Sequence, residues 1–220
     1  MSQSFTFLVL GATGGTGKHF VNIALREGHR VRVLLRSPEK LGDQVKDVQV
    51  WKGSIVDDID TIDTDKLVEG VDFVASMLGD KEAQRDSKIN YAFMQKLVPS
   101  MKKQGVKRFL YQAGGLSRPY QGSLSPVLWI VRNTIARGFD GQHKDNEAVM
   151  EYLETQAKDL DWIVHRAGIY LDGPSKGTLE RSQSSVSIAP HKDCADYSYR
   201  LLVDPSKDAI HTSDFSCYKS

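Results

Sequence analysis

Apolar and polar positions follow two different periods along this chain. Short apolar runs rich in β-branched and aliphatic residues indicate buried strands. Longer segments with apolar residues every three or four positions indicate amphipathic helices. We expect strands over residues 5–10, 30–35, 48–51, 71–76, 107–111 and 161–165. We expect helices over residues 15–27, 83–104, 142–158 and 193–203, with a short one ending near Gly70.

Strands that alternate with helices predict a parallel sheet, because a right-handed crossover joins each strand to the next. We therefore predict an α/β fold, a doubly wound parallel sheet of the Rossmann type with strand order 3-2-1-4-5-6. Residues 1–220 are long enough for one domain with a full core. We expect the segments of about 116–142 and 168–192 to form a small substrate-side extension of that domain.

Three stretches fit the pattern less well. Pro99 lies inside the helix expected over 83–104 and should end or kink it. Residues 118–141 lose the regular period and indicate either an apolar helix or a lid. After Val203 we expect only a short tail.

Three glycines with the spacing G-x-x-G-x-x-G join the first expected strand to the first helix. Gly11 would make the tight turn, Gly14 would let the backbone touch a phosphate, and Gly17 would let the helix lie close to the strand. The first helical turn offers free N–H groups and the positive end of the helix dipole, which suit a pyrophosphate. This position at the first strand favours dinucleotide binding over a purely structural turn. The expected phosphate loop comprises Gly11, Thr13, Gly14, Gly15, Thr16 and Gly17.

The end of the second strand distinguishes NAD from NADP. An acidic residue there binds the ribose 2′-hydroxyl, whereas an arginine accommodates a 2′-phosphate. This strand ends in Arg36 and Ser37, with Lys40 one turn away and with Glu39 only beyond the strand end. Because a guanidinium binds phosphate through two parallel hydrogen bonds, we predict NADP as the cofactor, with NADPH preferred over NADH. The alternative is that Arg36 is a solvated strand-end charge.

Loops at the carboxyl ends of parallel strands line the ligand crevice of this fold. Further cofactor-binding candidates therefore come from the ends of the third, fourth and fifth strands. These candidates are Ser54, Ser76, Met77, Leu78, Gln112 and Ala113.

Charge, cysteine content and the length of the apolar stretches limit the binding partners and the compartment that we expect for this protein. The formal net charge is +1, which indicates neither a nucleic-acid partner nor an acidic surface. Cys194 and Cys217 fit no metal spacing and no disulfide framework, and they suit a reducing compartment. The first apolar run is too short for a secretory core, and no stretch approaches the length of a membrane span. We expect a cytoplasmic monomer or homodimer that binds a small-molecule substrate, without a metal, nucleic acid or membrane.

Four segments together resemble the atypical short-chain dehydrogenases/reductases, in the NmrA-like, NAD(P)-binding single-domain branch that includes flavin/biliverdin-reductase-like proteins. These segments are GATGGTG at 11–17, VLLRSPEKL at 33–41, DWIVHRAG at 161–168 and DCAD at 193–196. The resemblance covers nearly the whole chain. It implies the fold and the cofactor class, but it names no substrate.

The chain departs from that family at three points. The usual Gly-Asp after the third strand is Gly53-Ser54, and the serine usually found at the end of the fifth strand is Ala113. Classical members also use Tyr-x-x-x-Lys, and none of the eight tyrosines here has a lysine four positions on. The phenol and ammonium pair of the Ser-Tyr-Lys mechanism is therefore missing.

Another group must supply a proton if hydride transfer occurs. His143 and Lys144 begin the helix expected before the last strand, and histidine titrates near neutrality. Glu147 lies one turn further on and could orient either residue, although all three also suit a solvated helix start. Tyr120 in the irregular segment and Tyr170 after the last strand are further candidates, which are more often half-buried structural residues.

Three functions fit this sequence. The leading hypothesis is an NADP-dependent oxidoreductase that transfers a hydride between the nicotinamide and a small apolar or aromatic substrate. The second is an NADP-binding, redox-sensing regulatory module without turnover, which the missing Ser-Tyr-Lys set favours. The third is a non-redox isomerase, cyclase or lyase on the same fold.

Overall fold

The computed structural model describes residues 3–169 and 172–219, and its centre is a nine-stranded sheet. The strand order is β3-β2-β1-β4-β5-β6-β9-β7, and β8 pairs with β6 beside this path. The first six positions confirm the predicted order 3-2-1-4-5-6. The strands are β1 Thr6–Leu10, β2 Arg30–Leu35, β3 Gln49–Lys52, β4 Phe73–Ser76, β5 Arg108–Gly114, β6 Asp161–Ile169, β7 Leu179–Ser182, β8 Ile188–Ala189 and β9 Thr212–Tyr218.

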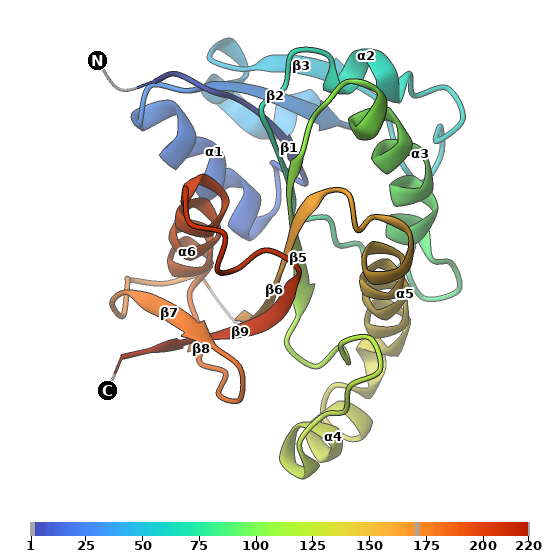
Figure 1. The fold of residues 1–220 in the computed structure, drawn as a ribbon, viewed down its shortest axis with the longest axis vertical. Helices are drawn as coiled ribbons and strands as arrows, with labels where there is room; N and C mark the ends of the chain where they lie inside the picture. The colour runs from blue at the N-terminus through green and yellow to red at the C-terminus, as the bar shows by residue number, and fades with distance from the viewer. Residues whose placement is uncertain (1–2, 170–171, 220) are drawn as a thin grey trace.

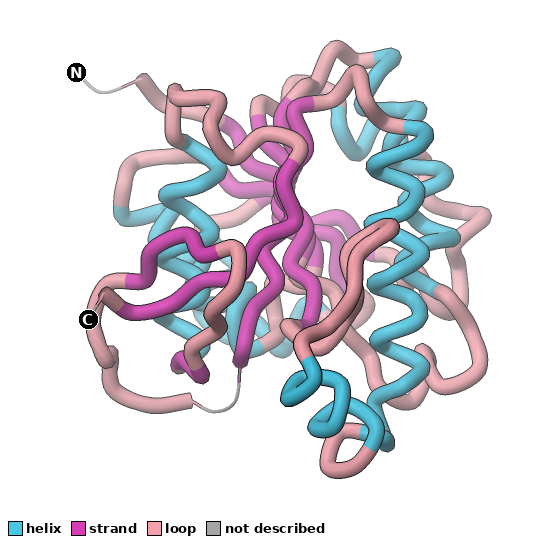
Figure 2. Tube along the Cα trace, turned by 60° about the horizontal axis from the view of Figure 1, so that its bottom comes forward, coloured by secondary structure: helices cyan, strands magenta, loops and turns pink. Residues whose placement is uncertain are grey.

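Helices cover both faces of the sheet (Figures 1 and 2). One apolar core lies between the sheet and α2, α3 and α5, and a second lies between the sheet and α1 and α6. The helix α4 projects away from both layers, at the bottom of Figure 1. The helices are α1 Gly15–Arg26, α2 Thr64–Val68, α3 Ile89–Lys103, α4 Pro126–Asn133, α5 Asp140–Gln156 and α6 His191–Val203, with 3-10 turns η1 Pro38–Lys46 and η2 Arg137–Phe139.

The strand β1 is the central element of the fold. All five of its residues are buried, as expected of a parallel strand that is covered on both faces. It pairs in parallel with β2 on one side and with β4 on the other. The strands β2 and β3 therefore lie on one side of β1, whereas β4 and the later strands lie on the other. This reversal of strand order is a topological switch point, and it places a crevice at the carboxyl ends of β1 and β4.

The fifth and sixth strands run further than predicted. Gln112, Ala113 and Gly114 continue β5 and pair with residues 165–167 of β6, although we had expected a loop after Tyr111. Parallel pairing with β6 satisfies the backbone groups of these three residues. Gln112 and Ala113 are therefore held by the sheet rather than by a loop.

The helix expected over 83–104 begins only at Ile89, and Pro99 neither ends nor interrupts it before Lys103. Proline removes one helical hydrogen bond. Here the surrounding side chains hold the helix, since Leu97, Val98 and Met101 are fully buried around Pro99. Packing of these side chains in the core therefore outweighs the tendency of Pro99 to end or kink the helix.

The expected C-terminal tail is instead the strand β9, which lies between β6 and β7. It pairs in parallel with β6 and antiparallel with β7. Its sequence, TSDFSCY, is too polar to indicate a strand without its neighbours. The prediction of a tail was therefore wrong.

A buried carboxylate joins α5 to the start of α3. Asp145 is fully buried and accepts hydrogen bonds from the backbone N–H groups of Asn90, at 3.0 Å, and Tyr91, at 2.9 Å. The amide of Gln84 donates a third bond at 2.7 Å. A negative charge at a helix N-terminus is favourable, so Asp145 fixes where α3 begins and how α5 lies against it.

His165 is a buried histidine whose burial can be tested by the pH dependence of stability. Its ring is fully buried between β6, α6 and β9, with Nδ1 2.9 Å from Ser198 Oγ and Nε2 2.8 Å from Ser216 Oγ. Burial lowers the pKa of His165 from 6.5 to about 3.

We predict that the free energy of unfolding decreases as the pH falls below about 6.5. Between that pH and about 3 the unfolded chain binds a proton that the folded His165 does not bind. One such group contributes about 1 kcal/mol per pH unit. Urea unfolding of His165→Gln between pH 6 and pH 4 should give a slope shallower by that amount. Val164→Ala should lower stability without changing the slope, and an unchanged slope in His165→Gln would contradict this assignment.

Candidate cofactor site

The turn between β1 and α1 depends on close backbone contacts. Gly11 has φ +79°, and a Cβ added to it would lie 2.5 Å from the carbonyl oxygen of Met77. A Cβ on Gly17 would lie 2.1 Å from the carbonyl oxygen of Gly11. Gly14 is less constrained, with Gly11 O at 3.2 Å from its added Cβ. Glycine thus lets α1 begin against β1 and lets the loop after β4 pass beneath it.

This arrangement fits a dinucleotide phosphate. The first turn of α1 carries no acidic residue, and its leading N–H groups point beyond the helix end. The positive end of the helix dipole therefore meets an open backbone cradle. A side chain at Gly11 or Gly17 would destroy that cradle.

A cavity of about 260 Å³ extends from the glycine turn toward the ends of β2, β3 and β4. Eight of the predicted cofactor residues line it: Gly11, Thr13, Gly14, Arg36, Ser37, Ser54, Met77 and Leu78. Lys40, Asp80 and Asn90 also contribute to its wall. The predicted residues Gly15, Thr16, Gly17, Ser76, Gln112 and Ala113 lie outside this lining.

The charged end of the cavity contains an acid as well as bases. Arg36 Nη1 lies 3.7 Å from a carboxylate oxygen of Asp80, which follows β4 on the opposite wall. The side chain of Arg36 is 54% exposed, so this ion pair is weak and easily exchanged. The sequence pattern did not identify Asp80, because only the fold brings the loop after β4 to the end of β2.

The predicted cofactor-binding residues Ser54 and Ser76 differ in their hydrogen bonding. The hydroxyl of Ser54 donates to an Asp57 carboxylate oxygen at 2.7 Å and accepts from the Asp57 backbone N–H at 3.2 Å. Its hydrogen-bonding capacity is therefore largely used within its own loop. Ser76 is fully buried, and its hydroxyl has no hydrogen-bond partner among the described residues.

On the other side of the glycine turn, three polar side chains meet. Gln112 Nε2 donates to Thr16 Oγ1 at 3.3 Å, and Thr16 Oγ1 lies 3.2 Å from His191 Nδ1. The helix α6 begins at His191, two residues before the predicted start, and it packs beside α1 (Figure 1). His191 is thus a member of the site that sequence analysis missed, since its separation from Thr16 along the chain gave no signal.

His143 lies on α5 beside the end of β5. It is 6% exposed, and its Nδ1 is 3.5 Å from the hydroxyl of Ser117, which accepts from Asn146 at 3.2 Å. Burial, together with the charge of Arg132, lowers the pKa of His143 to about 4. Its imidazole is therefore neutral at neutral pH, with Nε2 buried and unpaired among the described residues.

The other catalytic candidates lie apart from His143. Lys144 is exposed, and its ammonium lies 2.7 Å from Asp140. Tyr120 is exposed in the loop before α4, and Tyr170 lies outside the described residues. Glu147 bonds with Arg118 and Arg132 rather than with His143. The chain thus brings one predicted proton donor, His143, into a buried polar cluster.

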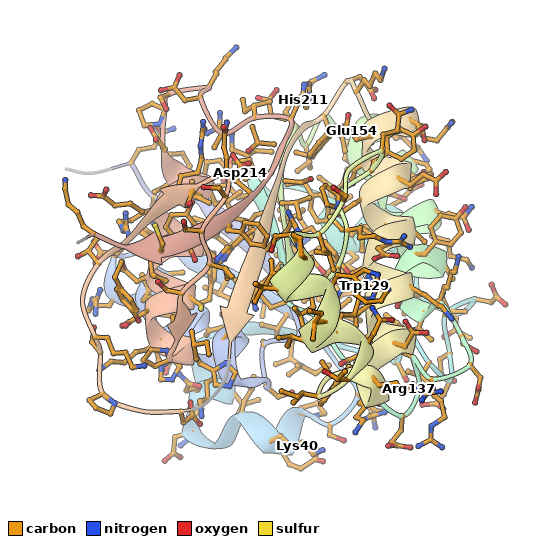
Figure 3. The ribbon with its side chains drawn as sticks, turned by 90° about the horizontal axis from the view of Figure 1, so that it is seen from below. Lys40, Trp129, Arg137, Glu154, His211 and Asp214 are labelled. Carbon is orange, nitrogen blue, oxygen red and sulfur yellow. The ribbon has the colours of Figure 1, made fainter. Side chains whose placement is uncertain are left out.

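The irregular segment 118–141 contains α4, and the side chain of Arg132 anchors this helix. Arg132 is buried and donates to the carbonyl oxygen of Leu116 at 3.1 Å, and it also pairs with Glu147 on α5. Figure 3 shows Trp129 on this helix and Lys40 on η1 near the margin of the same view. The exposed apolar side chains of the segment are Tyr120, Val127, Trp129, Ile130, Ile135 and Phe139.

Two negative findings apply to residues 3–169 and 172–219 alone. Within these ranges no helix is long and apolar enough to cross a membrane. The same ranges contain no group of three histidine, cysteine, aspartate or glutamate side chains that could hold a metal ion.

Comparison with known proteins adds a family and several similar folds. A family model described as NAD(P)H-binding matches residues 11–205. Pinoresinol reductase 1 of Arabidopsis thaliana is 34% identical over 221 residues, which cover 90% of this chain and 64% of that protein. The chain therefore spans less than two thirds of the length of this curated relative.

Two solved structures illustrate the shared fold. ChuY, an anaerobillin reductase from Escherichia coli O157:H7, superposes with a TM-score of 0.73 at 18% identity, covering 96% of each chain. The oxidoreductase ylbE from Lactococcus lactis gives 0.72 at 15% identity, covering 96% of this chain and 90% of that one. At these identities the likeness shows the fold alone.

We predict that Gly17→Ala destabilises the protein, although alanine is normally the better helix residue by about 1 kcal/mol. Its Cβ would meet the backbone oxygen of Gly11, which cannot rotate away. We expect a loss of about 1–3 kcal/mol in urea unfolding, together with weaker dinucleotide binding. Gly173→Ala is the control, since nothing lies within 4 Å of its added Cβ. Equal stability of the two variants would contradict the close approach of α1 and β1.

Proposed function

Because the chain belongs to the NAD(P)H-binding family, we propose that it is an NADPH-dependent oxidoreductase acting on a small apolar or aromatic substrate. The observation that carries the proposal is the placement of Arg36 and Lys40 in the cavity that leads to the glycine turn. Pinoresinol reductase 1 supports a reduction, because that relative is named as a reductase.

The roles of the binding residues follow from their positions. The cofactor supplies the hydride chemistry when it is bound. The N–H groups at the start of α1 would hold its pyrophosphate. Arg36, with Lys40 beside it, would bind a 2′-phosphate. Met77 and Leu78, after β4, would lie along the adenosine half.

The segment beyond β5 supports the proposed substrate class. Apolar side chains of α4 and its flanks are exposed, with Trp129 58% and Ile130 54% accessible. Arg132 anchors this helix to Leu116, which follows the strand that carries Gln112 and Gly114. Exposed apolar area held beside the segment that follows β5 suits an apolar or aromatic ligand.

His143 would act as a neutral hydrogen-bond donor rather than as an imidazolium acid. Its lowered pKa of about 4 leaves almost no protonated imidazole at neutral pH. A neutral imidazole can still polarise a carbonyl oxygen. The proton itself would then come from solvent. Because Nε2 of His143 is buried in the free protein, this role requires the side chains around it to open when the substrate binds. His143 would then orient the substrate oxygen, and Ser117 and Asn146 would hold the ring through its other nitrogen.

Calorimetric titration of NADPH and NADH tests the cofactor preference. We expect Arg36→Ala to weaken NADPH binding by about 1–3 kcal/mol and NADH binding far less, because only NADPH carries the 2′-phosphate. Asp80→Asn should have the opposite effect on NADPH, since it removes a carboxylate that competes for Arg36. Arg26→Ala, on the exposed end of α1, is the matched control. Equal loss of both nucleotides in Arg36→Ala would refute a role in 2′-phosphate recognition.

The turnover test follows NADPH oxidation at 340 nm against quinones, flavins and aromatic carbonyl compounds. With an accepted substrate, His143→Leu should lower kcat roughly 10-fold to 100-fold, at or below the low end of the usual range for a general acid, because it removes a hydrogen-bond donor. NADPH affinity should stay at the wild-type value. Lys144→Gln is the control from the exposed face of the same helix turn. Full activity in His143→Leu would exclude this role.

A redox-sensing binding module remains the second candidate, favoured by the missing Tyr-x-x-x-Lys pair and by the neutral His143. It predicts tight NADPH binding, no oxidation across the panel, and a protein partner whose affinity differs between NADP⁺ and NADPH. Conversion of a substrate without added nucleotide would instead indicate a non-redox enzyme.

A further inference from the structure

His191 lies over the start of α1. A Cβ added to Gly15 would be 2.5 Å from both Cδ2 and Nε2 of His191, so the imidazole occupies the place of a side chain at Gly15. The helices α1 and α6 pack side by side, and both begin at this contact. Tyr199, further along α6, contacts Phe20 in the middle of α1 and His29 just beyond the C-terminal end of α1. The two helices are therefore parallel, and both positive dipole ends meet at His191.

The hydrogen bonds of His191 leave one ring nitrogen available. Its Nδ1 lies 3.2 Å from Thr16 Oγ1, and Gln112 holds the same hydroxyl from β5. Its Nε2 has no hydrogen bond within the part of the chain that the structure describes. This nitrogen lies above Gly15, whose own N–H is one of the unpaired donors of the first helical turn. An acceptor bound by that N–H would therefore also lie near Nε2.

The charges around the ring come from α1 and from the segment after β6. Lys18 Nζ lies 3.1 Å from Asp172 Oδ2, and His19 Nε2 lies 3.7 Å from Asp172 Oδ1. Burial lowers the pKa of His191, Asp172 raises it, and Lys18 and His19 lower it. The free protein therefore holds this imidazole mostly neutral at neutral pH. An anion placed against Nε2 would raise the pKa of His191 and favour uptake of a proton.

We propose that His191 is a ligand of the cofactor pyrophosphate, with Nε2 donating to a phosphate oxygen on the nicotinamide side while Nδ1 stays on Thr16. The strand order indicates which phosphate His191 would bind. Arg36, the proposed adenosine-side contact, lies at the end of β2, whereas Gln112 and α6 lie toward β5 and β6 on the opposite, nicotinamide side. This inference rests on the proposed dinucleotide binding. It adds a contact that couples cofactor affinity to pH.

The experiment compares three ligands on the purified full chain by calorimetry at pH 6 and pH 8. NADPH and NADP⁺ carry both phosphates of the pyrophosphate, whereas 2′,5′-ADP lacks the one on the nicotinamide side. Glutamine keeps a donor but cannot take up a proton. His191→Gln should therefore weaken NADPH binding about tenfold at pH 6, the effect of losing the charge assistance to one hydrogen bond, and less at pH 8. It should leave 2′,5′-ADP binding within twofold of wild type. His19→Gln, in the same charged cluster, is the control.

Proton uptake gives an independent readout. NADPH titrations at pH 7 in two buffers with different ionisation enthalpies should show a fractional proton taken up by wild type and a smaller fraction by His191→Gln. Equal uptake in the two proteins, or an equal loss of 2′,5′-ADP binding, would overturn the inference. Failure of wild type to bind any of the three nucleotides would refute the proposed function itself. Wild-type binding of 2′,5′-ADP by His191→Gln also shows that the variant is folded.

Discussion

The close approach of backbone to backbone at the end of β1 is the constraint on which this molecule depends. Gly17 meets the carbonyl oxygen of Gly11, and Gly11 meets that of Met77, at distances that exclude a Cβ. These contacts bring α1, β1 and β4 to one point. The cradle of N–H groups, the cavity beside it and the position of α6 over Gly15 all follow from that point.

Polar groups buried on the other side of the sheet hold the second half of the site. Asp145 ties α5 to the start of α3. Tyr111 donates to Asn146 at 2.6 Å and accepts from Asn90 at 3.1 Å, so β5 is joined to the same two helices. An unpaired buried group in such a network is costly, and among the described residues Asn90 Oδ1 and His143 Nε2 have no partner. Burial of His143 beside this network explains its neutral form.

The sequence predicted the order of the first six strands and most helix boundaries, because hydrophobic periodicity is a local property. The wrong predictions concern elements whose stability comes from neighbours. Pro99 stays within α3 because the side chains around it are buried, and the polar strand β9 forms because β6 and β7 pair with it. Gly114 continues β5 for the same reason. Local preference gave no indication of these pairings.

For the site, the sequence by itself determined the glycine turn before α1 and the base at Arg36, since the spacing of glycines and the residue at a strand end are visible in a linear pattern. The tertiary structure alone decided that Asp80 faces Arg36, that His191 covers Gly15, and that His143 is buried and neutral. These residues are far apart along the chain from the groups they touch. Their charge and hydrogen bonding depend on distance and on exclusion of water, which exist only after the chain has folded.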